Sequence, residues 1–269
     1  MKTYKQVFSE LKEQNRAALI PFFVIGDPDF DTSLAIVKTA INAGADVLEL
    51  GIPFSDPIAD GPTIQKADIR AMRSGMNLGK ALEFIRKVKE YRDVPIGLLM
   101  YYNLVYQYGV EKFFNDFHKA GVNSVLVADL SIDDADEIIG PAKSAGLDTV
   151  FMVTPVTKPE RMKLIASKTT GFIYTVSVLG VTGSRDKLSG TVEGLLGKLK
   201  KLTSVPVCVG FGISKAEHAA AVAQAGADGV IIGSKIVGLI ENNLDDKEKM
   251  LAGISTFLSE VKGAISTRT

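Results

Sequence analysis

A short phrase, Ala-Gly-X-Asp or Ala-Gly-X-Asn, occurs four times along the chain and constrains the fold more than any other feature. Its glycines stand at positions 44, 121, 146 and 226. Each copy follows a helical pattern and precedes an apolar run, as expected where a helix ends on a left-handed glycine and a tight turn leads into a strand. The shortest interval fits one strand–helix unit, and the longer intervals fit about three units each. The phrase therefore indicates a repeated βα architecture.

Eight apolar runs are interpreted as strands. They cover residues 18–24, 47–50, 95–100, 124–128, 149–153, 172–177, 206–209 and 230–232. The helical patterns between them carry apolar residues at three- and four-residue spacing. They cover residues 32–43, 78–91, 110–120, 134–145, 159–168, 192–202, 215–225 and 235–242. Near-continuous apolar strands that alternate with helices indicate a parallel sheet covered on its outer face.

Eight such units predict an α/β fold of the (β/α)8 TIM barrel type. Additional helices are expected over 3–14, 62–74 and 247–262, and the first of these is expected to cap the bottom of the barrel. An open, doubly wound sheet is the alternative. With 269 residues, 46% of them hydrophobic, the chain is long enough for one barrel domain over 1–269.

The charge balance excludes several kinds of partner. Lys and Arg number 31, as do Asp and Glu, and no basic block appears, so neither nucleic acid nor an anionic membrane surface is expected. The first residues lack an apolar signal core, and no run approaches the ~20 apolar residues that span a bilayer, which predicts a cytoplasmic protein. The single cysteine, Cys208, excludes an internal disulfide and is expected to be a buried thiol. A small-molecule ligand or a protein partner is favoured.

A glutamate inside an apolar strand and an aspartate on the loop that follows are the strongest catalytic candidates. Glu49 has apolar neighbours in sequence, so burial would raise its pKa and let it exchange protons near neutral pH. Asp60 lies on a loop whose prolines restrict the backbone. Functional groups of barrels gather where strands end, which favours catalysis by this pair. The alternative is a glutamate held by backbone donors and an aspartate that caps the next helix.

Glycine and serine follow the last two expected strands. Gly212-Ile213-Ser214 and Gly233-Ser234 each stand between a strand and a helix, where barrels commonly hold phosphate with backbone N–H groups. In the alternative interpretation the glycines make tight turns, and Ser214 and Ser234 are N-caps. The two segments together favour a phosphate site.

Other enzyme classes fit less well. None of the expected strands contains a lysine for a Schiff base, and His118 and His218 lie in separate helical patterns without a metal-ligand cluster. Dinucleotide binding lacks the third glycine after Gly212. A phosphosugar isomerase with Glu49 as its base and a noncatalytic subunit that keeps a phosphate pocket stay open as alternatives.

Residues 48–62 resemble the signature segment of the tryptophan synthase α subunit family, and the similarity extends over the whole chain. It includes Pro21-Phe22, Leu98 to Tyr101 with Asn103, Val125 to Asp129, Tyr174, Gly180 to Gly183, Gly210 to Ser214, and Gly233-Ser234. The signature segment is specific, whereas the glycine turns alone would be a weak signal.

This resemblance implies reversible retro-aldol cleavage of indole-3-glycerol phosphate to indole and glyceraldehyde 3-phosphate, a lyase step of tryptophan biosynthesis. Glu49 would be the main acid/base, and Asp60, kept ionised, would hydrogen-bond the indole N–H. The family's indole pocket corresponds to Phe22, Leu99, Tyr101, Ala128, Met152, Tyr174 and Phe211. Its phosphate site corresponds to Gly183, Gly212, Ile213, Gly233 and Ser234.

The loop over 179–190 is expected to be a mobile lid, because it holds three glycines and several charged residues. A connection without function is the alternative. By resemblance, Gly183 closes over the phosphate and Thr182 fastens the closed lid to Asp60.

The resemblance further implies an α2β2 complex in which indole passes through a tunnel to a pyridoxal phosphate site on the β subunit, so that no cofactor binds this chain. Contacts to the β subunit would come from Asn103 with the loop beyond it and from Pro53, Phe54, Asp56 and Pro57. Docking would fix Asp60 and favour the closed lid, which raises activity by population shift.

Overall fold

The computed structural model describes residues 1–176, 185–210 and 212–266, apart from the side chains of 185–191. Within this part of the chain, the strands form one parallel sheet. They are β1 (Ala18–Val24), β2 (Leu48–Gly51), β3 (Ile96–Met100), β4 (Ser124–Val127), β5 (Asp148–Thr149), β6 (Phe151–Val153), β7 (Ile173–Val176), β8 (Val207–Gly210) and β9 (Gly229–Ile232).

The order of the strands closes the sheet into a barrel. It runs β5-β4-β3-β2-β1-β9-β8-β7-β6, so the two outermost strands are consecutive in sequence and only Val150 separates them. The strand expected over 149–153 is thus two short strands that together fill one position in the barrel. Of these, β5 pairs with β4, and β6 pairs with β7. The predicted TIM barrel is confirmed, and the open-sheet alternative is wrong.

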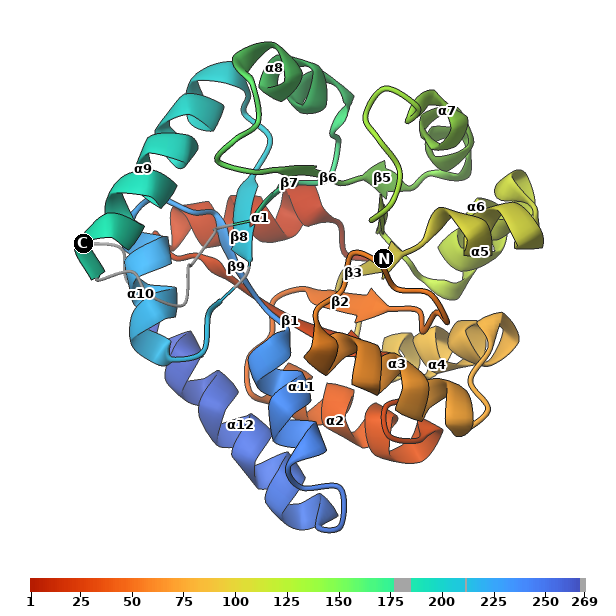
Figure 1. Cartoon of the computed structure of the whole chain (residues 1–269). Helices are drawn as coiled ribbons and strands as arrows, with labels where there is room; N and C mark the ends of the chain where they lie inside the picture. The colour runs from red at the N-terminus through yellow and green to blue at the C-terminus, as the bar shows by residue number, and fades with distance from the viewer. Residues whose placement is uncertain (177–184, 211, 267–269) are drawn as a thin grey trace.

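An outer ring of helices covers the barrel (Figure 1). The helices are α1 (Tyr4–Glu13), α2 (Phe30–Asn42), α3 (Pro62–Arg73), α4 (Leu78–Tyr91), α5 (Tyr102–Tyr108), α6 (Val110–Ala120), α7 (Asp136–Ala145), α8 (Pro159–Lys168), α9 (Arg185–Leu202), α10 (Ala216–Gln224), α11 (Ser234–Glu241) and α12 (Lys247–Ala264). Two expectations were wrong. The loop expected beyond Asn103 is the helix α5, and α9 begins at Arg185, inside the segment expected to be a loop.

The N-terminal helix closes the bottom of the barrel, as predicted. Its apolar face buries Tyr4, Val7, Phe8 and Leu11 in the inner core, together with residues of several strands. The Tyr4 ring packs edge-on against Phe172, with 5.6 Å between ring centroids. A capping box between Thr3 and Gln6 fixes the start of the helix.

The repeated Ala-Gly-X-Asp/Asn phrase stabilises the same end of the barrel. In three copies the side chain of the fourth residue accepts a hydrogen bond from the backbone N–H of a neighbouring strand. Asp46 accepts from Leu19 (2.8 Å), Asn123 from Ile96 (3.0 Å) and Asp228 from Val207 (2.9 Å). These contacts join adjacent strands below their main ladders, which gives the repeat a physical reason beyond its glycine turn.

The Asn123 contact predicts a measurable loss of stability. Asn123 is 6% exposed, and its amide also donates to the Lys2 carbonyl at 2.9 Å. Asn123→Leu leaves the Ile96 N–H without its partner, which should lower the free energy of unfolding by about 1–3 kcal/mol. Urea denaturation measures this change. The exposed Asn115→Leu serves as the control and should stay within about 0.5 kcal/mol of the wild type. An Asn123→Leu protein as stable as this control would contradict the prediction.

Candidate active site

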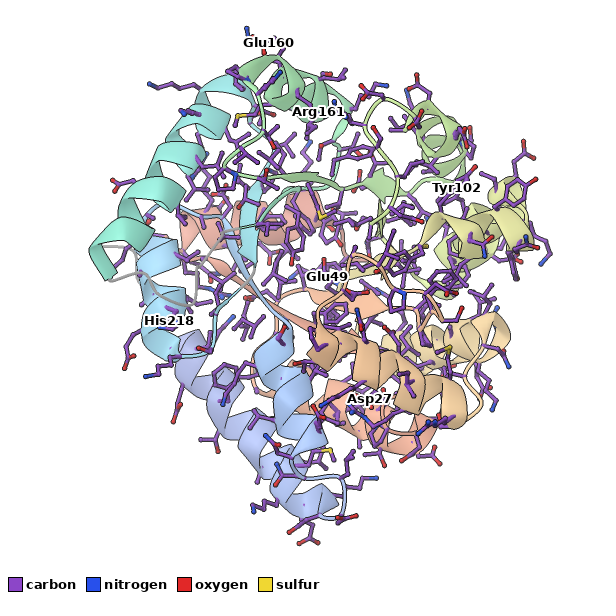
Figure 2. All side chains as sticks on the ribbon, viewed as in Figure 1. Asp27, Glu49, Tyr102, Glu160, Arg161 and His218 are labelled. Carbon is purple, nitrogen blue, oxygen red and sulfur yellow. The ribbon has the colours of Figure 1, made fainter. Side chains whose placement is uncertain are left out.

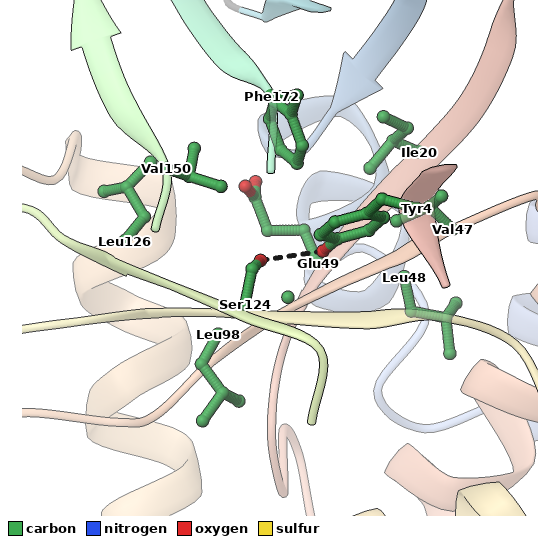
Figure 3. Close-up of a pocket in the computed structure, with 11 residues that line it drawn as sticks. Tyr4, Ile20, Val47, Leu48, Glu49, Leu98, Ser124, Leu126, Val150 and Phe172 are labelled. Carbon is green, nitrogen blue, oxygen red and sulfur yellow. Dashed lines mark hydrogen bonds between the residues drawn. The ribbon is translucent and has the colours of Figure 1, made fainter. Parts of the chain in front are cut away.

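Glu49 lies within β2, and its carboxyl group occupies a closed niche inside the barrel (Figure 3). The niche is bounded by Tyr4 from below, by Phe172 just before β7, by Val150 between β5 and β6, and by Leu126 on β4. The described side chains leave no room there for a water molecule, and Glu49 is only 3% exposed. Its Oε2 atom has no hydrogen-bond partner among the described residues. Glu49 therefore lies within the strand, as the sequence indicates, and its carboxyl is enclosed in the barrel interior.

The niche keeps Glu49 protonated at neutral pH. Burial raises the pKa of its carboxyl to about 8, and the negative charge of Asp60 adds to this effect. The nearby Tyr4 and Ser124 hydroxyls bond to each other at 2.8 Å. This bond needs Gly97 on β3, since a Cβ there would lie 2.7 Å from the Tyr4 hydroxyl oxygen. The group is thus a neutral acid whose Oε2 has no fixed partner in the described part of the chain.

Asp60 has a different environment, on the loop between β2 and α3. The Tyr101 hydroxyl donates to Asp60 Oδ2 at 2.7 Å and accepts from the Ala59 backbone N–H at 3.0 Å. Phe54 stacks on the Tyr101 ring, with 5.0 Å between centroids. Burial raises the pKa of Asp60, and the Tyr101 hydrogen bond lowers it. The loop therefore holds one carboxyl oxygen of Asp60 in place.

The residues of the expected indole pocket lie on several strands around one mouth. Leu99, Ala128, Met152 and Tyr174 are partly buried and pack on the inner core. Phe22 is buried on β1, and Tyr101 is buried beside Asp60. The Tyr174 side chain needs Gly210, because a Cβ there would lie 2.3 Å from its hydroxyl oxygen. The expected member Phe211 lies outside the described residues.

The expected phosphate residues lie at the starts of α10 and α11. Gly212 has a left-handed φ of 74°, Ile213 is buried, and Gly233 is the N-cap of α11, with no side-chain capping bond. Ser234 is the first residue of that helix, and Lys215 is the N-cap of α10. The alternative in which Ser214 and Ser234 are N-caps is therefore wrong. At the start of α11 the N–H groups of Ile236 and Val237 donate to the Gly233 carbonyl, at 2.8 and 3.1 Å, whereas those of Ser234 and Lys235 have no intrahelical acceptor and can bind an anion. Gly183 and Thr182 lie outside the described residues.

The expected partner contacts lie on the loop after β2. Pro53 is buried, Phe54 and Pro57 are half-buried, and Asp56 is exposed and bonds to the Ser55 hydroxyl. The next residue, Ile58, is 83% exposed. Two further exposed apolar side chains lie beyond other strands, Tyr106 on α5 and Val156 after β6. These loops meet at the same end of a parallel barrel.

Sequence reasoning missed two buried aspartates beside this loop. Asp68 on α3 is 4% exposed, its Oδ2 has no partner among the described residues, and burial followed by the charge of Asp60 raises its pKa to about 8. Asp27 forms a two-point ion pair with Arg70 on α3, at 2.6 and 2.9 Å. Asp68 shares the buried face of its helix with Ile64, Ala67 and Ala71. The helical spacing of these residues in the sequence was the available signal that Asp68 is buried.

Two general features complete the description. Across residues 1–176, 185–210 and 212–266, no three His, Cys, Asp or Glu residues are placed to hold a metal ion. Among the helices of these residues, none has the length and apolar character needed to cross a membrane.

Comparisons with known proteins agree with each other. The family profile described as "Tryptophan synthase alpha chain" matches residues 8–266. The tryptophan synthase alpha chain of Methanothermobacter thermautotrophicus is 45% identical over 262 residues, covering 97% of this chain and 96% of that protein. That of Methanoregula boonei is 42% identical over 259 residues, covering 96% and 98%.

Solved structures match over the same extent. Tryptophan synthase subunit alpha from Legionella pneumophila has a TM-score of 0.91 at 31% identity and covers 98% of both chains. A ligand-free tryptophan synthase structure from M. tuberculosis has a TM-score of 0.88 at 30% identity and covers 99% of this chain and 100% of that chain.

The buried acid predicts a pH dependence of stability. Because the pKa of Glu49 rises from its ordinary 4.5 to about 8 on folding, the native chain keeps a proton that the unfolded chain has lost between these values. Stability should therefore fall as pH rises through this window, by at most roughly 1.4 kcal/mol per pH unit for one group. Glu49→Gln removes this term, so its stability relative to the wild type should increase from pH 5 to pH 8 in urea denaturation. Asp68 titrates in both proteins and cancels in the comparison. If the stabilities of Glu49→Gln and the wild type changed with pH in parallel, Glu49 would be ionised in the folded chain, contrary to the prediction.

Proposed function

Because the chain belongs to the tryptophan synthase alpha chain family, we propose that Glu49 and Asp60 carry out the proton transfer and charge stabilisation of this family's reaction. The enzyme is a carbon–carbon lyase that cleaves indole-3-glycerol phosphate to indole and glyceraldehyde 3-phosphate. The observation that carries the assignment is the contrast between the two carboxyls. One is neutral, with its Oε2 unpartnered among the described residues, and the other is held by a tyrosine hydroxyl at the barrel mouth.

Glu49 is suited to be the acid and then the base. Its carboxylic acid gives a proton to indole C3, which makes the ring a cation and weakens the bond from C3 to the glycerol carbon. The resulting carboxylate takes the proton of the glycerol hydroxyl as the aldehyde forms, so the enzyme ends in its starting state. To do this, the side chain must rotate from its niche toward the mouth. The unpartnered Oε2 loses no hydrogen bond on leaving.

Asp60 is suited to stabilise the ring cation. Tyr101 donates to its Oδ2 atom, which leaves Oδ1 for the indole N–H. A carboxylate that is already oriented needs no reorganisation as positive charge develops on the ring nitrogen. The apolar ring itself would lie against Leu99, Ala128, Met152 and Tyr174, with Phe22 and Phe211 completing the pocket.

The phosphate would bind across the mouth from Asp60, at Gly212, Ile213, Gly233 and Ser234. The start of α11 presents backbone N–H groups and the positive end of the helix dipole, and glycine at the N-cap lets an anion approach the backbone. Gly183 would add to this site, and Thr182 would join the lid to Asp60. The substrate would then span the mouth, with its reacting carbon between the phosphate site and Glu49.

Activity measurements test these roles. Purified wild-type chain should release indole and glyceraldehyde 3-phosphate from indole-3-glycerol phosphate, which an isomerase or a noncatalytic subunit would not do. Glu49→Gln should lower the turnover rate by about 10²–10⁴-fold because no proton donor remains. Asp60→Asn should lower it by about 10²-fold because the charge is lost.

The matched control is Asp245→Asn, an exposed carboxyl between α11 and α12, which should turn over like the wild type. Circular dichroism checks that each variant is folded. A folded Glu49→Gln protein within tenfold of the wild-type rate would overturn the assignment of the acid.

An alpha chain of this family has a β-subunit partner. The proposed contact surface is the loop with Pro53, Phe54, Asp56 and Pro57, extended by the exposed Ile58, Tyr106 and Val156. We further propose an α2β2 assembly in which indole passes to pyridoxal phosphate on the β subunit, in the cytoplasm. Since Phe54 stacks on Tyr101 and Tyr101 holds Asp60, docking on this loop would act directly on Asp60.

Replacing Ile58 by aspartate tests the contact surface. Burying a charge where an apolar side chain docks should weaken binding of the β subunit by about 10- to 100-fold, measured by isothermal titration calorimetry. Leu244→Asp is the control, because Leu244 is 43% exposed in the connection at the other end of α11. Equal affinities of the two variants would move the contact surface away from this loop.

A further inference from the structure

A cavity of about 200 Å³ lies in the barrel wall between β4 and β6. Among the described residues, the β4–β5 ladder ends with the hydrogen bond from Val150 N to Val125 O, at 3.0 Å. Beyond this point the chain turns away from β4 and pairs with β7. The space left between the strands is lined by Leu126, Val150, Met152 and Ile165, with Ser131 and Arg161 at its rim. We refer to it as the wall cavity.

The rim of the wall cavity is held by a surface ion pair. Arg161 on α8 donates to Asp133 at 2.6 Å and to Ser131 at 3.1 Å, which joins the helix to the loop after β4. Arg161 and Asp133 are 47% and 59% exposed, and ion pairs so exposed hold weakly. Figure 2 places Arg161 at the periphery of the molecule and Glu49 near its centre. The cavity is partly open to solvent at this rim, and its mainly apolar lining and neutralised arginine favour an uncharged ligand.

The wall cavity and the Glu49 niche share two lining residues. Leu126 on β4 and Val150, between β5 and β6, line both spaces. Met152, which lines the cavity, also packs on the inner core at the expected indole pocket. A molecule in the cavity would thus lie directly beside the site where the reaction takes place.

We propose that the wall cavity is a second binding site, which takes one molecule of indole. Apolar cavities of about 150 Å³ bind one benzene ring, so this larger space fits a fused two-ring molecule. The Ser131 hydroxyl already accepts from Arg161 and from the Asp133 N–H, so the indole N–H would face the solvent at the open rim and bond to water there. The identity of the ligand rests on the proposed function, whereas the cavity does not involve Glu49 or Asp60.

Binding of indole to a chain whose mouth is occupied tests the proposal. The Glu49→Gln chain is saturated with indole-3-glycerol phosphate and titrated with indole by calorimetry. One indole should bind per chain, with a dissociation constant on the order of 1 mM, as expected for so small a ligand. Ile165→Phe, which fills the cavity from α8, should weaken this binding at least tenfold. Leu251→Phe, on α12, is the matched control and should leave it unchanged.

Two outcomes would overturn the second site: no indole bound to the saturated chain, or equal binding by the Ile165→Phe and Leu251→Phe chains. If Ile165→Phe does not fold, Val127→Leu, a smaller enlargement from β4, decides by the same comparison. Failure of the proposed function gives a different result, in which the Glu49→Gln chain cleaves its substrate at the wild-type rate.

Discussion

The barrel interior cannot solvate the charge of Glu49, and the rest of the site depends on this constraint. The ring of strands and the capping helix α1 leave no room for water beside the carboxyl, so burial, with the negative charge of Asp60 as a second cause, raises its pKa to about 8. Tyr4 on the helix α1 and Phe172 in the barrel wall both help to enclose the carboxyl group. The feature that makes a TIM barrel stable, a packed interior, therefore also supplies an acid that is protonated at neutral pH.

Stability and function are divided between the two ends of this barrel. At the bottom, Asp46 is paired on both sides: its carboxylate accepts from the Leu19 N–H and from Lys262, at 2.8 and 2.6 Å. Inside the barrel and toward its mouth, Glu49 and Asp68 each keep an oxygen without a partner in the described residues, which disfavours folding. The tethers of the repeated phrase thus offset the cost of the reactive groups at the other end.

The architecture could be predicted from the sequence because it follows local patterns. The bounds of α4, α6 and α8 agree with the helical patterns, and the glycine turns indicate where strands begin. What failed depends on contacts between distant segments. Helix α5 buries little apolar surface, and its first N–H bonds to Asp129 from the loop after β4, at 2.8 Å. The expected strand breaks at Val150 because its first part pairs with β4 and its second part pairs with β7. The residues of the strand do not themselves specify this pairing.

The sequence predicted which residues form the candidate site. It did not predict how their side chains are arranged. No local pattern shows that Tyr101 orients Asp60 or that Glu49 turns away from the mouth, since both depend on packing. This geometry has a consequence for the proposed chemistry. Asp60 opposes the ionisation of Glu49, and the ring cation relieves that repulsion while it exists. As the carbon–carbon bond breaks, the cation disappears and the repulsion returns, so Glu49 becomes a stronger base at the step where it must take up the hydroxyl proton.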